Sequence, residues 1–106
     1  MNNKAIDYLI ATKAMEWEDN GTPFYGINGE RVASKEYFQP SDNIKDAWKV
    51  VEKFYISVCP QKGAPKEMSY HAEIDNQPMG NYYESFDETA PMAICKVALK
   101  SLGVII

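Results

Sequence analysis

The stretch EMSYHAEID, residues 67–75, decides the fold because its side chains alternate strictly between apolar and polar. Met68, Tyr70, Ala72 and Ile74 fall on one side of an extended chain, and Glu67, Ser69, His71, Glu73 and Asp75 fall on the other. A period of two residues is typical of a β-strand that buries one face and leaves the other in solvent. The segment therefore predicts a half-buried strand.

The segments on either side of this stretch predict two more strands. FYISVCP, residues 54–60, is rich in β-branched and aromatic side chains and stops at Pro60. YYESFDE, residues 82–88, is a shorter and more mixed strand. The connecting segments, 61–66 and 76–81, are short and carry turn residues, which favours an antiparallel meander.

Apolar residues recur at helical spacing in residues 3–16, 41–54 and 89–103. In the second of these segments the stripe expected in the core consists of Ile44, Ala47, Trp48, Val51 and Tyr55. The sequence predicts one α+β domain, residues 1–106, in which an antiparallel β-sheet of three to four strands is layered with three helices.

Residues 17–40 are the least regular part of the chain. FYGINGERV, residues 24–32, lies inside them, and Asn28-Gly29 is a strong two-residue turn signal because both residues tolerate positive φ. A small hairpin is the favoured interpretation. The alternative is a loop whose backbone N–H groups cradle a phosphate together with Arg31, although a G-x-x-G spacing alone is a weak signal.

Composition excludes several classes of partner. The net charge is −4, and 11 Lys and Arg are scattered among 15 Asp and Glu, so no basic stripe is visible and DNA or RNA is not expected as a partner. The N-terminus lacks the apolar run of a signal peptide, and no apolar stretch of roughly 18 residues could cross a membrane. A cytoplasmic protein is expected, with Cys59 and Cys95 reduced and buried as small hydrophobes.

His71 is the single histidine, and it stands two residues from Glu73 on the polar side of the central strand. A metal site lacks a further histidine ligand, so no metal and no cofactor are expected. A nucleophile–base pair would need His71 next to Cys59 or a serine, with a third group orienting the ring. No catalytic residue is predicted, and hydrogen bonding to a ligand is the favoured role for His71.

Three segments carry a resemblance to a known family. PSDNIKDAWKVVEKF, residues 40–54, and APMAICKVALKSLG, residues 90–103, resemble the central and C-terminal helices of the phage ABA sandwich domain family. KAIDYLIATKAMEW, residues 4–17, is similar to its N-terminal helix. The resemblance implies an α-β-α sandwich, a phage origin and a setting in the host bacterial cytoplasm. It implies no catalytic residues.

The favoured function is a non-enzymatic counter-defence protein, a sponge that binds and sequesters a small nucleotide-derived host immune signal. Such a site needs aromatic side chains for the base and a few cations for the phosphates. The candidate ligand-binding residues are Trp17, Tyr25, Arg31, Lys35, Tyr37 and His71. Because a second subunit often completes the pocket of a small domain, a homo-oligomer is expected.

A second function is held open. The chain could be a protein-binding inhibitor or adaptor that docks on a host protein through Tyr82, Tyr83 and Phe86, which lie near acidic residues. Tyrosine-rich patches are enriched at protein interfaces. An enzyme acting through His71 is the third and least favoured hypothesis.

Overall fold

The computed structural model describes residues 2–19, 23–25, 31–34, 37–76 and 81–104, and side chains within 2–19, 37–75 and 81–104. The elements in chain order are α1 (Asn3–Leu9), the π-helix η1 (Ile10–Ala14), β1 (Glu18–Asp19), β2 (Pro23–Tyr25), β3 (Arg31–Ser34), α2 (Ile44–Phe54), β4 (Ser57–Pro60), the 3-10 helix η2 (Lys66–Met68), β5 (Tyr70–Asn76), β6 (Asn81–Asp87) and α3 (Ala90–Ser101).

Strands β4, β5 and β6 form the predicted antiparallel meander. Ala72 of β5 stands opposite Val58 of β4 and Ser85 of β6, so these side chains share one face of the sheet. Ala72 and Ile74 are buried, whereas Asp75 is exposed, which confirms the alternation that predicted the strand. The hydrophobic face of this sheet therefore points toward the core.

The strand boundaries differ from the predicted ones at two places. Residues 54–56 do not belong to β4, because α2 continues through Phe54 and ends on a left-handed Tyr55. Lys66–Met68 form a 3-10 turn, and β5 begins at Tyr70. The side chain of Met68, predicted on the buried face, is 39% exposed for this reason.

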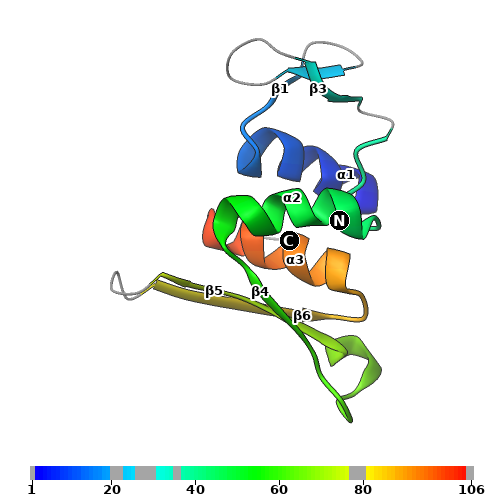
Figure 1. Ribbon diagram of the computed structural model, residues 1–106, viewed down its shortest axis with the longest axis vertical. Helices are drawn as coiled ribbons and strands as arrows, with labels where there is room; N and C mark the ends of the chain where they lie inside the picture. The colour runs from blue at the N-terminus through cyan, green and yellow to red at the C-terminus, as the bar shows by residue number, and fades with distance from the viewer. Residues whose placement is uncertain (1, 20–22, 26–30, 35–36, 77–80, 105–106) are drawn as a thin grey trace.

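Helix α3 is the central layer of the molecule. It contacts β5 and β6 on one side and α2 and η1 on the other, so α1, η1, α2 and α3 all lie on the same face of the β4–β5–β6 sheet (Figure 1). Its buried side chains include Ile94, Val97 and Leu99, each with no exposed surface. The α+β class, with a three-stranded antiparallel sheet and three helices, is confirmed.

A second small sheet, in the order β1–β2–β3, stands at the opposite end of the molecule from the meander (Figure 1). Strands β2 and β3 are antiparallel, with Tyr25 paired with Arg31, as the hairpin prediction requires. The predicted turn at Asn28-Gly29 lies outside the described residues.

The predicted core stripe of α2 is partly wrong. Ala47 and Val51 are buried, but Ile44 and Trp48 are each 51% exposed and Tyr55 is 88% exposed. The buried side of the helix is centred nearer to Val50 and Phe54 than to Ile44 and Trp48, since Val50 has no exposed surface and Phe54 is half-buried. The α2 helix therefore has more apolar surface than its neighbours cover.

The prediction that both cysteines are buried holds for one of them. Cys95 lies in α3 with no exposed surface, and burial raises the pKa of its thiol. Cys59 is exposed, because it falls on the outer face of β4, opposite His71. Both thiols are free.

A half-buried carboxylate joins α1 to the segment before α2. The backbone N–H of Ser41 donates to Asp7 Oδ1 at 2.8 Å. Burial raises the pKa of Asp7, and the nearby Asp42 and Asp46 raise it further, while the hydrogen bond from Ser41 opposes the rise. The ionised form of Asp7 is consequently disfavoured in the folded state.

Replacing Asp7 with asparagine is expected to stabilise the fold increasingly as pH rises. A carboxyl whose pKa is raised on folding contributes stability below its unfolded value of 3.8, and this contribution is lost as pH rises through the folded value. Asparagine keeps the acceptor oxygen and carries no charge. Urea unfolding across this range measures the difference, with the exposed Asp75→Asn as control. A constant difference between Asp7→Asn and the native chain would contradict the pKa direction.

Candidate binding surfaces

A hollow of about 330 Å³ opens where the C-terminal ends of α2 and α3 meet one end of the β5–β6 pair. We call it the end pocket. It is lined by Lys53, Phe54, Tyr55, Ile74, Asn81, Tyr83, Ser101 and Leu102. Its volume is within the range of small-molecule sites, roughly 300–1,000 Å³.

The end pocket combines aromatic side chains with a small number of polar groups. Phe54 and Tyr83 are half-buried, whereas Tyr55 stands at the rim in solvent. Lys53 supplies a cation and Asn81 an amide that can both donate and accept hydrogen bonds. This lining suits a flat ring with polar edges.

The electrostatics of the end pocket are mixed. The C-terminal ends of α2 and α3 carry partial negative charge, and Lys53 and Lys100 stand in their last turns, where cations offset that charge. Lys53 Nζ also lies 3.4 Å from Glu16 Oε2, in an ion pair that solvent reaches. Because surface ion pairs are weak, Lys53 can exchange Glu16 for an anionic group of a ligand.

Tyr55 occupies a conformation that its side chain does not favour. Its φ and ψ are 54° and 55°, in the left-handed region that glycine usually fills after a helix. The side chain is 88% exposed, so burial in the core does not compensate the strain. Backbone outliers of this kind cluster at functional sites.

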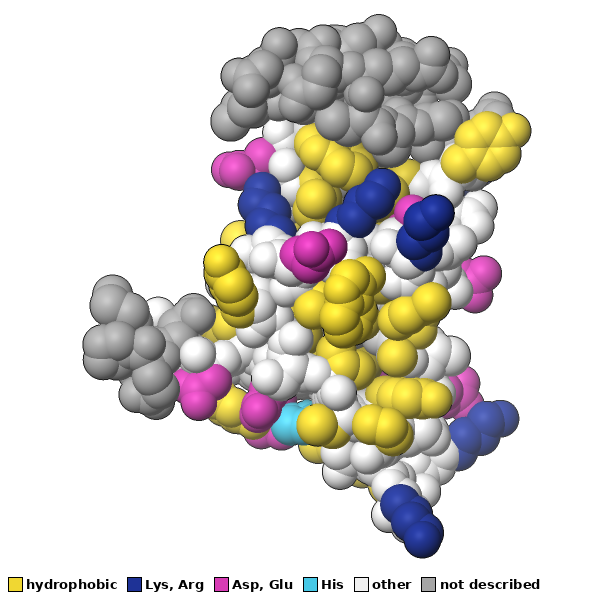
Figure 2. Space-filling view, viewed as in Figure 1, with side chains coloured by type: hydrophobic (Ala, Val, Ile, Leu, Met, Phe, Trp, Pro, Cys, Tyr) yellow, Lys and Arg dark blue, Asp and Glu magenta, His cyan; other side chains and the backbone are white. Residues whose placement is uncertain are grey.

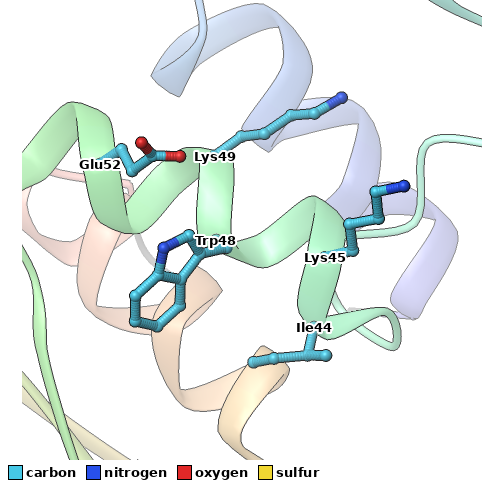
Figure 3. A pocket seen from close by; sticks show the side chains of 5 residues that line it. All are labelled: Ile44, Lys45, Trp48, Lys49 and Glu52. Carbon is cyan, nitrogen blue, oxygen red and sulfur yellow. The ribbon is translucent and has the colours of Figure 1, made fainter.

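The outward face of α2 forms a second surface, a shallow groove of about 440 Å³. Ile44 and Trp48 point to one side of the helix, and Lys45, Lys49 and Glu52 point to the other (Figure 3). Figure 2 shows apolar side chains gathered over α2 in the middle of the molecular face. Lys49 Nζ lies 5.8 Å from the centre of the Phe38 ring, which draws this lysine away from Trp48.

The outer face of the β4–β5–β6 sheet carries the residues discussed for catalysis. His71 stacks on Phe86, with ring centres 4.6 Å apart, and its Nε2 lies 3.2 Å from Glu84 Oε1. Cys59 is the cross-strand neighbour of His71 on the other side. The ring is thus oriented by Glu84, but no hydrogen bond between His71 and Cys59 forms among the described atoms. Tyr82 lies on the same face and donates a hydrogen bond to Glu73, which raises the pKa of Tyr82 to about 12.

Trp17, Tyr37 and His71 are the predicted candidates whose side chains the structure describes, and it does not bring them together in one hollow. Trp17 packs against Phe38, with ring centres 4.7 Å apart, and Tyr37 is 77% exposed. His71 belongs to β5 of the meander (Figure 1). None of these three side chains lines either hollow described above.

The remaining candidates are placed only in part. Tyr25 and Arg31 are paired across β2 and β3, but their side chains are not among the described ones. Lys35 lies outside the described residues. The proposed role of the 17–37 segment in ligand binding therefore stays a prediction.

Among the residues that the structure describes, no three His, Cys, Asp or Glu side chains gather closely enough to hold a metal ion. No helix in the described part of the chain has the length and apolar character needed to cross a membrane.

The chain is similar to proteins of phages. The family model described as Phage ABA sandwich domain matches residues 8–99. A 2.0 Å crystal structure of a phage protein from Bacillus cereus ATCC 14579 is 33% identical in sequence and superposes with a TM-score of 0.75, covering 100% of this chain and 92% of that one. No curated protein sequence matches the chain.

Proposed function

The chain belongs to the phage ABA sandwich domain family, and we propose that it is a non-enzymatic phage accessory protein that sequesters a small nucleotide-derived signal of host defence. The end pocket is the proposed site. This role needs only a pocket that holds its ligand, and a phage gains from it by lowering the free concentration of the signal.

The left-handed conformation and the exposure of Tyr55 are the observation that carries the proposal. An exposed aromatic side chain in a left-handed conformation is unfavourable for folding, yet this position at the rim suits a ring that stacks on a ligand. Every nucleobase has a flat face, and stacking on aromatic side chains is a general means of binding it. Tyr55 is therefore assigned to the base.

The other lining residues supply complementary groups. Lys53 is assigned to a phosphate, because it stands next to Tyr55 and its present partner Glu16 is solvent-exposed. Asn81 is assigned to the polar edge of the base.

Chemical-shift mapping tests the proposed site. Isotope-labelled protein is titrated with a panel of mononucleotides and cyclic dinucleotides. Saturable shifts of the amides of residues 53–55, 81–83 and 101–102 are expected. Saturable shifts confined to residues 31–37, abolished by Arg31→Ala, would move the site to the segment predicted from the sequence. No shifts with any nucleotide would contradict the proposal.

Binding to a host protein is the second candidate. The observation that favours it is the outer face of the β4–β5–β6 sheet, which the described helices leave uncovered and which presents Tyr82 and Phe86. Glu73 and Glu84 make this face acidic, so a basic partner is expected. A host protein captured by the native chain and by Tyr55→Gly, but not by Tyr82→Ala, would favour this function over sequestration.

A further inference from the structure

The α2 helix carries an apolar arc that is wider than its covered side. Successive residues are turned by about 100° around a helix axis, so Ile44 and Trp48 extend the arc that begins with Val50, Ala47 and Val51. The latter three are buried, and the first two are each half-exposed. Tryptophan is among the residues most enriched at the centres of protein interfaces.

One edge of this arc carries two opposite charges, which lie at about equal distances along the helix from its middle. Lys45 and Glu52 are two turns apart on the same edge of α2, roughly 10 Å along the axis, and the Trp48–Lys49 bond is midway between them. Lys49 is directed toward Phe38. The charges nearest the exposed apolar arc are thus a cation toward the N-terminal end and an anion toward the C-terminal end.

We propose that a second copy of this chain docks on this face, with the two α2 helices antiparallel across a two-fold axis at the Trp48–Lys49 midpoint. That axis places Lys45 of each copy opposite Glu52 of the other, so two equivalent ion pairs form. It also brings the two Trp48 side chains together beside the axis. A two-fold interface requires a surface that is complementary to itself, and this arrangement of charges meets the requirement.

The same geometry connects the interface to the end pocket. In the antiparallel arrangement, Ile44 at the start of one helix lies near Tyr55 at the end of the other. Each end pocket is then bordered by the second copy. The interface does not depend on the proposed function, since it rests on α2 alone.

Sedimentation equilibrium tests the proposal through charge reversal. The native chain is expected to dimerise reversibly. Lys45→Glu and Glu52→Lys are each expected to raise the dimer dissociation constant roughly tenfold or more, because each variant converts two ion pairs per dimer into two repulsive pairs. The double variant, which exchanges the two charges, is expected to restore the dimer to near the native dissociation constant.

Matched controls separate the interface from folding and from net charge. Lys62→Glu and Glu67→Lys make the same changes of charge at exposed positions outside α2 and are expected to leave the dissociation constant unchanged. Trp48→Ala is expected to raise it by roughly thirtyfold or more. Circular dichroism establishes that each variant is folded, and since Lys45, Trp48 and Glu52 are all exposed, native spectra are expected.

Three outcomes would overturn the proposal. One is a native chain that remains monomeric at millimolar concentration. Another is a dimer whose dissociation constant does not respond to Trp48→Ala. The third is a double variant that stays as weak as the single variants, because the two charges would then not face each other.

Discussion

Replacing Tyr55 with glycine is expected to weaken nucleotide binding by roughly tenfold to a hundredfold while making the fold more stable, by up to about 1 kcal/mol. The affinity falls because the exposed ring at the rim of the end pocket is lost. The stability rises because glycine adopts the left-handed conformation of this position without a clash at Cβ. Binding and stability are therefore expected to change in opposite directions.

Two measurements on the same variants check this result. Isothermal titration with the nucleotide that gives the strongest chemical shifts measures affinity, and urea unfolding measures stability. Tyr55→Phe keeps the ring and the backbone conformation and is expected to bind like the native chain. A Tyr55→Gly variant that retains full affinity would remove Tyr55 from the site, whatever its stability.

Replacing Leu99 with alanine is expected to lower the free energy of unfolding by about 2–5 kcal/mol. Leu99 has no exposed surface and belongs to α3, the layer that packs against both the sheet and the other helices. A cavity there removes apolar contacts from the interior of the domain. Because a domain of this kind is stable by only about 5–15 kcal/mol, the variant loses a large share of its stability.

Leu102→Ala provides a matched control, because it makes the same change of side chain at the end of the same helix. Leu102 is 44% exposed, so this variant is expected to lower the free energy of unfolding by less than about 1 kcal/mol. Urea unfolding of both variants gives the comparison. Equal losses at the two positions would contradict the assignment of α3 as the central layer.

The sheet of the meander could be predicted from the sequence because its signal is local. Strict alternation around His71 requires one face in and one face out, and Ala72 and Ile74 are buried as a result. The starts of α2 and α3 are also fixed by local contacts, since the side chains of Asn43 and Thr89 cap these helices. Both kinds of signal are contained within a few residues.

The burial of Ile44 and Trp48 in α2 was predicted wrongly because it depends on contacts that are not local in the sequence. Periodicity locates an apolar arc on a helix, but the part of it that becomes buried depends on what packs against it. Trp48 belongs to the arc and is still half-exposed, because the buried side of α2 is centred nearer Val50. Cys59 was misplaced for a similar reason, since the face of a short strand is decided by its register with β5.

The end pocket could not be predicted because it is assembled from distant segments. Its lining comes from α2, β5, β6 and α3, which are brought together only by tertiary packing. One signal was nevertheless present: the bulky Tyr55 follows directly on a helix that has no glycine to end it. Strands β2 and β3, which contain Tyr25 and Arg31 of the predicted site, stand at the opposite end of the molecule from the meander (Figure 1).

Native mass spectrometry of the chain purified gently from bacteria with active immune signalling tests the sequestration function most directly. The native chain is expected to retain a small molecule that is released unchanged on denaturation, and Tyr55→Gly is expected to lose it. A native chain that carries no added mass, from cells in which the signal is shown to be present, would contradict sequestration.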